Sequence, residues 1–112
     1  SQAGTVEWPF RDSDPEIQAQ AAKVAGDLRL VATAGALVQL LGSTHPRVQF
    51  HAALSLGKLK APTAVPGLIS LLNGPAERDP FLRHAAVLGL AGCASASELA
   101  RLASHPSASV RI

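Results

Sequence analysis

Three segments of the chain share a proline-centred pattern, and this internal repeat constrains the fold more than any other feature. From each proline of the pattern, an alanine recurs six places on and an apolar residue recurs thirteen places on. The apolar residue two places after the proline, with its counterpart near the C-terminus, recurs at Ile17, Val48, Leu82 and Val110. The intervals are 31, 34 and 28 residues. Repeats of this variable length are typical of stacked helical hairpins joined by turns of different lengths.

The first half of each repeat has the residues that begin an α-helix. Proline lacks an N–H and has a helical φ, so it suits the first helical position, and the residue before it becomes the N-cap. Asp14 and Asp79 are favourable caps, whereas His45 is a poorer one that we expect Thr44 to assist. In the second repeat the apolar residues that follow the proline form one helical face: Val48, Ala52, Leu56 and Leu59.

The second half of each repeat predicts another helix, over residues 33–41, 63–73 and 97–103. In the middle unit we expect Thr63 to be the N-cap, and Asn73-Gly74-Pro75 ends the helix. The sequence therefore predicts an all-α, right-handed α-solenoid of about three helical hairpins plus the start of a fourth. The expected units are an N-terminal capping segment 1–12, then 13–43, 44–78, 79–104 and a partial 105–112. We expect Val6, Trp8 and Phe10 to cover the exposed edge of the first hairpin.

Composition agrees with closely packed helices. The chain is 47% hydrophobic and 16% charged, enough to form a core, yet only 4% aromatic. Sheets favour β-branched and aromatic residues, whereas small aliphatic residues fit helices packed close together. The 112 residues suit one domain and leave no room for a separate catalytic domain. No apolar run approaches the roughly 20 residues that a membrane span needs, so we expect none in this segment.

Residues that could carry chemistry are few and isolated. Cys93 takes the repeat position that Leu28 and Leu59 take in the other units, so we expect it to be buried and inert. The four histidines lack the spacing of a metal site on one helix, and no carboxylate is placed in the sequence to complete such a site with His51 or His84. No nucleophile motif is present. We therefore expect no enzyme activity, no metal and no cofactor.

The predicted second helices carry few charges. Their only charged residues are Glu98 and Arg101, and their exposed positions include Gln39, Thr63 and Ser70. So neutral a surface suits a protein or peptide contact better than a phosphate backbone. The partner is either another protein or a neighbouring domain of the same chain.

A weaker alternative is nucleic-acid binding. The net charge is +2, and the stretch from residue 28 to residue 76 has cations but no Asp or Glu. Within it, Lys58 and Lys60 would contribute most to binding phosphates. A nucleic-acid binder usually gathers a denser basic stripe than this one.

The pattern Asp/His-Pro-x-apolar, Ala-Ala and Leu-Gly-x-Leu, followed by apolar-Pro-x-Leu-x-x-Leu-Leu, resembles HEAT repeats of the short, bacterial, lyase-like kind over residues 13–112. This resemblance implies a protein-binding scaffold or interdomain spacer without chemistry of its own, with a bilin-lyase type of enzyme as a further alternative. A narrower resemblance is to the HEAT segment of planctomycete-type proteins that join a sorbosone-dehydrogenase-like propeller to a cytochrome c domain. It implies a spacer in an exported redox protein, although no Cys-x-x-Cys-His is present here.

Overall fold

Six α-helices make up most of the part of the chain that the computed structural model describes, residues 8–112. The first helices of the units are α2 (Pro15–Asp27), α4 (Pro46–Leu59) and α6 (Pro80–Cys93). The second helices are α3 (Ala34–Leu40), α5 (Val65–Leu72) and α7 (Ala96–Ala103). Short 3-10 helices connect them: η1 (Trp8–Arg11), η2 (Val31–Thr33), η3 (Pro62–Ala64) and η4 (Pro75–Arg78). No strand occurs in residues 8–112, which confirms the all-α prediction.

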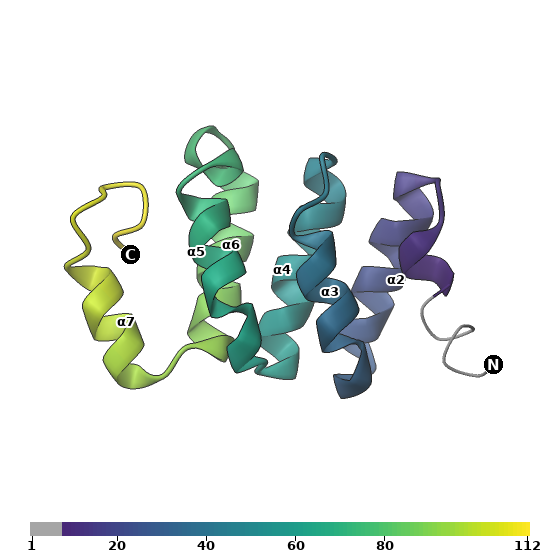
Figure 1. The fold of residues 1–112 in the computed structure, drawn as a ribbon, viewed down its shortest axis with the longest axis horizontal. Helices are drawn as coiled ribbons and strands as arrows, with labels where there is room; N and C mark the ends of the chain where they lie inside the picture. The colour runs from purple at the N-terminus through teal and green to yellow at the C-terminus, as the bar shows by residue number, and fades with distance from the viewer. Residues whose placement is uncertain (1–7) are drawn as a thin grey trace.

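The hairpins follow one another in chain order along the 45 Å long axis of the molecule (Figure 1). The first helices form one layer, in which α4 packs between α2 and α6. The helices α3 and α5 form a second layer over them, and α7 lies at the far end. This sequential stack is the predicted solenoid.

The prolines and their preceding residues begin the first helices as predicted. Asp14 accepts a hydrogen bond from a first-turn main-chain amide at 2.9 Å, and Asp79 accepts two at 3.1 Å. His45 is the N-cap of α4 but makes no side-chain cap bond. We expected Thr44 to assist this cap, but the hydroxyl that bonds there belongs to Ser43, which accepts a hydrogen bond from the His45 amide at 3.1 Å.

The second helices begin differently from the prediction. Thr63 is not the N-cap of its helix, because it lies inside the 3-10 helix η3 and α5 starts two residues later. A 3-10 turn likewise precedes α3. By contrast, α7 begins with a capping box: Ser95 accepts from the Glu98 amide at 3.2 Å, and the Glu98 carboxylate accepts from the Ser95 amide at 2.9 Å.

Small residues let the first helices approach one another closely. A Cβ added to Gly92 of α6 would lie 2.1 Å from the carbonyl oxygen of Gly57 in α4, and one added to Gly89 would lie 2.8 Å from that of Ala53. Between α2 and α4, a Cβ on Gly26 would overlap Ser55. Leucines fill the space between the two helix layers. The fully buried leucines are Leu37, Leu56, Leu68, Leu72, Leu82 and Leu90.

The edge of the stack at α2 differs from the prediction. Leu28 is 65% exposed, although its counterparts Leu59 and Cys93 are 8% and 6% exposed. The turn that follows the helix is not the cause, because Arg29 and Lys60 share a repeat position and a φ of 54°. The difference is that Leu28 belongs to the first unit of the stack, where no earlier first helix lies beside α2 in residues 8–112. Of the predicted capping residues, Phe10 is buried against the first hairpin. Val6 and the Trp8 side chain lie outside the described residues, so the capping role of residues 1–12 stays a prediction.

The C-terminal residues 105–112 form one hydrogen-bonded turn and no full helix. The carbonyl of Ser107 accepts from the amides of Val110 and Arg111 at 3.2 and 3.1 Å. Val110 is fully buried, as its repeat position predicts. The guanidinium of Arg83 in α6 donates to the carbonyls of Ser109 and Arg111, which fastens this turn to the stack.

Candidate functional site: the groove between the second helices

A groove runs between α3 and α5 on the second-helix layer, and we call it the α3/α5 groove. Its lining residues are Val38, Leu41, Gly42, Ser43, Thr44, Pro46, Gln49, Gly67, Ser70, Leu71 and Pro75. None of these described residues has an ionisable side chain. The groove is therefore apolar on its walls, with hydroxyl groups at its rim.

Two residues set the shape of the groove. Gly67 of α5 faces the end of α3, where an added Cβ would lie 3.0 Å from Cδ1 of Leu41. The missing side chain lets the two helices approach at that point. Below them, Gln49 of α4 is buried, and its Nε2 donates to the carbonyl oxygen of Leu41 at 3.1 Å. This bond satisfies a carbonyl at the helix end, a group that is otherwise left without a partner inside the helix.

The exposed hydroxyl of Ser70 is a polar group on the α5 wall of the groove. Ser43 and Thr44 supply further hydroxyls near the end of α3. A surface of this kind can hold apolar side chains of a ligand and exchange hydrogen bonds with its backbone. It offers no charge to bind a phosphate or a carboxylate.

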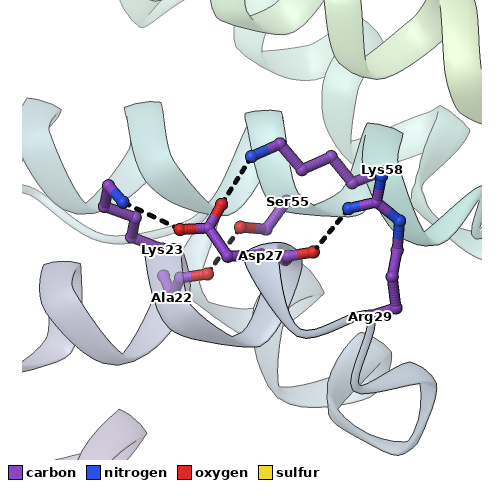
Figure 2. Close-up of polar contacts among 7 residues, drawn as sticks. Ala22, Lys23, Asp27, Arg29, Ser55 and Lys58 are labelled. Atoms are coloured by element: carbon purple, nitrogen blue, oxygen red, sulfur yellow. Dashed lines mark hydrogen bonds and ion pairs between the residues drawn. The ribbon is translucent and has the colours of Figure 1, made fainter.

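A second cluster, of polar contacts, joins α2 to α4 at the opposite layer (Figure 2). The carboxylate of Asp27 lies between two ammonium groups, 2.8 Å from Nζ of Lys23 and 2.7 Å from Nζ of Lys58. Hydrogen bonds from these two lysines lower the pKa of Asp27 to about 2. Nearby, the Ser55 hydroxyl donates to the carbonyl of Ala22.

The other end of the same interface carries a matching pair. Arg47 of α4 donates to both carboxylate oxygens of Glu16 in α2, at 2.8 and 3.1 Å. The hydrogen bond from Arg47 is the main reason why the pKa of Glu16 is lowered. Both pairs join residues 31 positions apart, which is the repeat length. Exposed ion pairs add little stability, so their main effect is to fix the register of the two helices.

The six residues predicted to form an interaction surface are all exposed, but they do not form one site. Ser70 lies on the α3/α5 groove, and Gln39 lines a neighbouring hollow beside Phe10. Thr63, Lys60 and Arg101 lie outside the α3/α5 groove. Lys58 is paired with Asp27. Sequence reasoning missed the walls of the groove, although Gly67, a poor helix former within a short helix, was a signal of close approach.

The cations of residues 28–76 are less available to bind phosphates than the sequence indicated. Arg47 and Lys58 have carboxylate partners, and Arg29 donates to the carbonyl of Gly26 at 2.9 Å. The carboxylates come from the preceding unit. The stretch contains no acids in sequence, but two of its four cations, Arg47 and Lys58, are neutralised across the interface between α2 and α4.

In the part of the chain that the structure describes, reactive and metal-binding groups are not gathered into a site. Cys93 is buried, its Sγ lies 3.2 Å from the carbonyl oxygen of Leu56, and burial raises the pKa of its thiol. Burial also lowers the pKa of His51, whose ring meets that of Phe50 edge-on at 5.2 Å between centroids. Across residues 8–112, no cluster of three or more His, Cys, Asp or Glu side chains is placed to hold a metal ion.

Comparison with known proteins bears on most of the repeat array. A family model of HEAT repeats matches residues 5–91, which include the α3/α5 groove and most of α6. No curated protein matches the chain. The narrower resemblance to exported redox proteins therefore has no support. Within the described residues, no helix combines the length and the apolar character needed to cross a bilayer.

Proposed function

The chain belongs to the HEAT-repeat family, and on this premise we propose that it is an interaction scaffold whose α3/α5 groove binds an uncharged, partly apolar segment of a protein. HEAT repeats commonly serve as protein-interaction scaffolds, and the family is typically non-enzymatic. The observation that carries the proposal is the lining of the groove. It combines apolar walls with exposed hydroxyls, and none of its described residues is charged.

The bound segment can belong to a separate protein or to a neighbouring domain of the same chain, in which case the array is an interdomain spacer. Both roles use the same groove and the same chemistry. Nucleic-acid binding and a place in an exported redox protein remain alternatives, and no structural observation favours either of them. The pairing of Arg47 and Lys58 with carboxylates reduces the positive potential that the first alternative needs.

The proposal is tested by selecting random displayed peptides for binding to the chain and measuring the recovered peptides by calorimetry. We expect neutral sequences with apolar residues. The substitution Ser70→Arg places a long charged side chain in the groove and should weaken their binding by at least about tenfold, which is roughly 1.4 kcal/mol. Thr63→Arg adds the same side chain at an exposed position outside the groove and should leave binding unchanged.

Equal binding to wild type and Ser70→Arg would contradict the assignment of the groove. The nucleic-acid alternative has its own assay, which is the salt dependence of binding to duplex DNA. A steep dependence that becomes shallower in Lys58→Ala and Lys60→Ala would favour that alternative over a protein scaffold.

A further inference from the structure

The side of α2 that faces away from α4 is apolar and exposed. A groove on this side is lined mainly by Pro9, Phe10, Ile17, Ala21, Val24 and Leu30. Ile17 is 38% exposed and Val24 is 47% exposed. We call this surface the α2 face.

The positions that form the α2 face are buried in the two following units. Counted from each proline, they are the second, sixth and ninth residues. Their counterparts are Val48, Ala52 and Ser55 in α4 and Leu82, Ala86 and Gly89 in α6, all of them buried. In both units these positions contact the first helix of the preceding unit. The Ser55 hydroxyl donates to the carbonyl of Ala22, and Gly89 lies against the backbone of Ala53. The α2 face therefore continues an interface that the chain already uses twice.

The residues before α2 also follow the repeat register. Phe10 lies 31 places before Leu41, the C-cap of the second helix of the first unit, and both residues are buried. Gln18 and Gln49 are likewise 31 places apart, and each donates its Nε2 proton to a carbonyl of the segment before its helix, at 2.7 and 3.1 Å.

The same register extends to the start of the sequence. Ala3-Gly4 lies 31 places before Ala34-Gly35, and Val6 lies 31 places before Leu37. Residues 1–12 therefore match residues 32–43, which hold the second helix of the first unit and the turn after it.

From these two registers we propose that the α2 face is a docking site for a first-type helix of this repeat, the counterpart of the helix that precedes residues 32–43. The chemistry of the occupant follows from the interfaces already present. At the α2/α4 interface, α2 contributes Ala22 and Gly26. At the α4/α6 interface, α4 contributes Ala53 and Gly57. The occupant is thus an amphipathic helix with small residues four places apart. This proposal concerns the array and does not depend on the function of the α3/α5 groove.

The test is to extend the full chain with a copy of residues 13–31 placed directly before Ser1. This copy restores the 31-residue register, because residues 1–12 then follow it as residues 32–43 follow the original. We expect one cooperative thermal transition with a melting temperature at least about 4 °C higher, because a repeat array gains stability from each interface. We also expect slower amide exchange in α2.

Two variants separate docking from a general effect of added chain. A matched extension with Ala22→Gln and Gly26→Gln in the copy keeps the tendency to form a helix but prevents close approach, so it should give no gain. Val24→Asp in α2 should leave the melting temperature of the unextended chain nearly unchanged, since Val24 is half exposed. The same substitution should abolish the gain in the extended chain.

The proposal is overturned if the extension raises the melting temperature no more than the matched extension that carries the two Gln substitutions. Two other results would also overturn it by naming a different occupant. The first is a dimer of the unextended chain, seen by light scattering and dissociated by Val24→Asp, because a second copy then covers the α2 face. The second uses Trp8, the one tryptophan of the chain. The result would be blue-shifted Trp8 emission in the unextended chain that moves to the red in Val24→Asp. Such a shift means that the N-terminal residues themselves cover the α2 face.

Discussion

Replacing Gly92 with alanine should force α6 away from α4 and destabilise the array. Gly92 faces Gly57 across the interface, and an added Cβ would lie 2.1 Å from the carbonyl oxygen of Gly57 and 2.8 Å from its carbonyl carbon. Both atoms belong to a helix backbone, so no side chain can rotate to make room. Either the helices separate or α4 deforms.

The size of the effect follows from this distance. A methyl carbon needs roughly 3.2 Å from an oxygen, so the helices must separate by about 1 Å, and a gap of that size loses about a quarter to a half of the dispersion attraction across it. Overpacking of a close contact costs about 1–3 kcal/mol. The higher helix propensity of alanine offsets at most about 1 kcal/mol of this cost. The offset is smaller here because Gly92 lies in the last turn of α6, which ends at Cys93. The expected net loss is about 1–2 kcal/mol, which lowers the melting temperature by roughly 5–15 °C.

Thermal and urea unfolding followed by circular dichroism at 222 nm measure this loss. Gly35→Ala is the matched control, because it changes the same residue type within helix α3 but an added Cβ there meets nothing within 4 Å. That control should be neutral or stabilising by up to about 1 kcal/mol. If Gly92→Ala melts at or above the wild-type temperature while Gly35→Ala behaves as expected, the close packing of α4 on α6 is refuted.

Three further predictions concern single side chains. Asp27 has a pKa of about 2 in the folded chain, below its ordinary 3.8, so its pairing stabilises the fold above pH 4 and is lost as the pH falls towards 2. Asp27→Asn should therefore be less stable than wild type at pH 7 by urea unfolding, and a difference that persists unchanged at pH 2 would refute this. The buried Cys93 thiol should react with a disulfide reagent at least roughly a hundredfold more slowly in the folded than in the urea-unfolded chain, unlike an accessible thiol. Arg83→Met should speed amide exchange of Val110, because it removes the bonds to the C-terminal turn; unchanged exchange would mean that burial alone holds the turn.

Local chemistry made the first helices predictable. A proline at the first helical position and an aspartate before it act within one turn, so Asp14 and Asp79 could be identified as caps without knowledge of the fold. Thr63 was assigned wrongly because the 3-10 turn η3 precedes α5, and a cap inferred from residue type alone cannot register such a turn. Leu28 occupies a core position of the repeat, but burial requires a neighbour on that side as well as a suitable residue.

The site was less predictable, because it is made of residues from different units. The α3/α5 groove brings Val38 and Leu41 of one unit against Gly67 and Ser70 of the next, and only Ser70 of these was predicted. Lys58 was predicted to contribute to phosphate binding, and its pairing with Asp27 was not foreseen because Asp27 lies 31 residues earlier. Contacts between units depend on the register of the stack, which the pattern within a single unit does not contain.

Residue-resolved amide hydrogen exchange distinguishes a linear stack, in which only neighbouring hairpins share a core, from a closed bundle. In a linear stack we expect the slowest exchange in α4, which packs between α2 and α6, faster exchange in α2, and the fastest in α7, whose contacts with the other helices are sparse. Protection in α7 equal to that in α4 would mean that the chain ends are packed as firmly as its middle, as in a closed bundle, and would refute the linear stack.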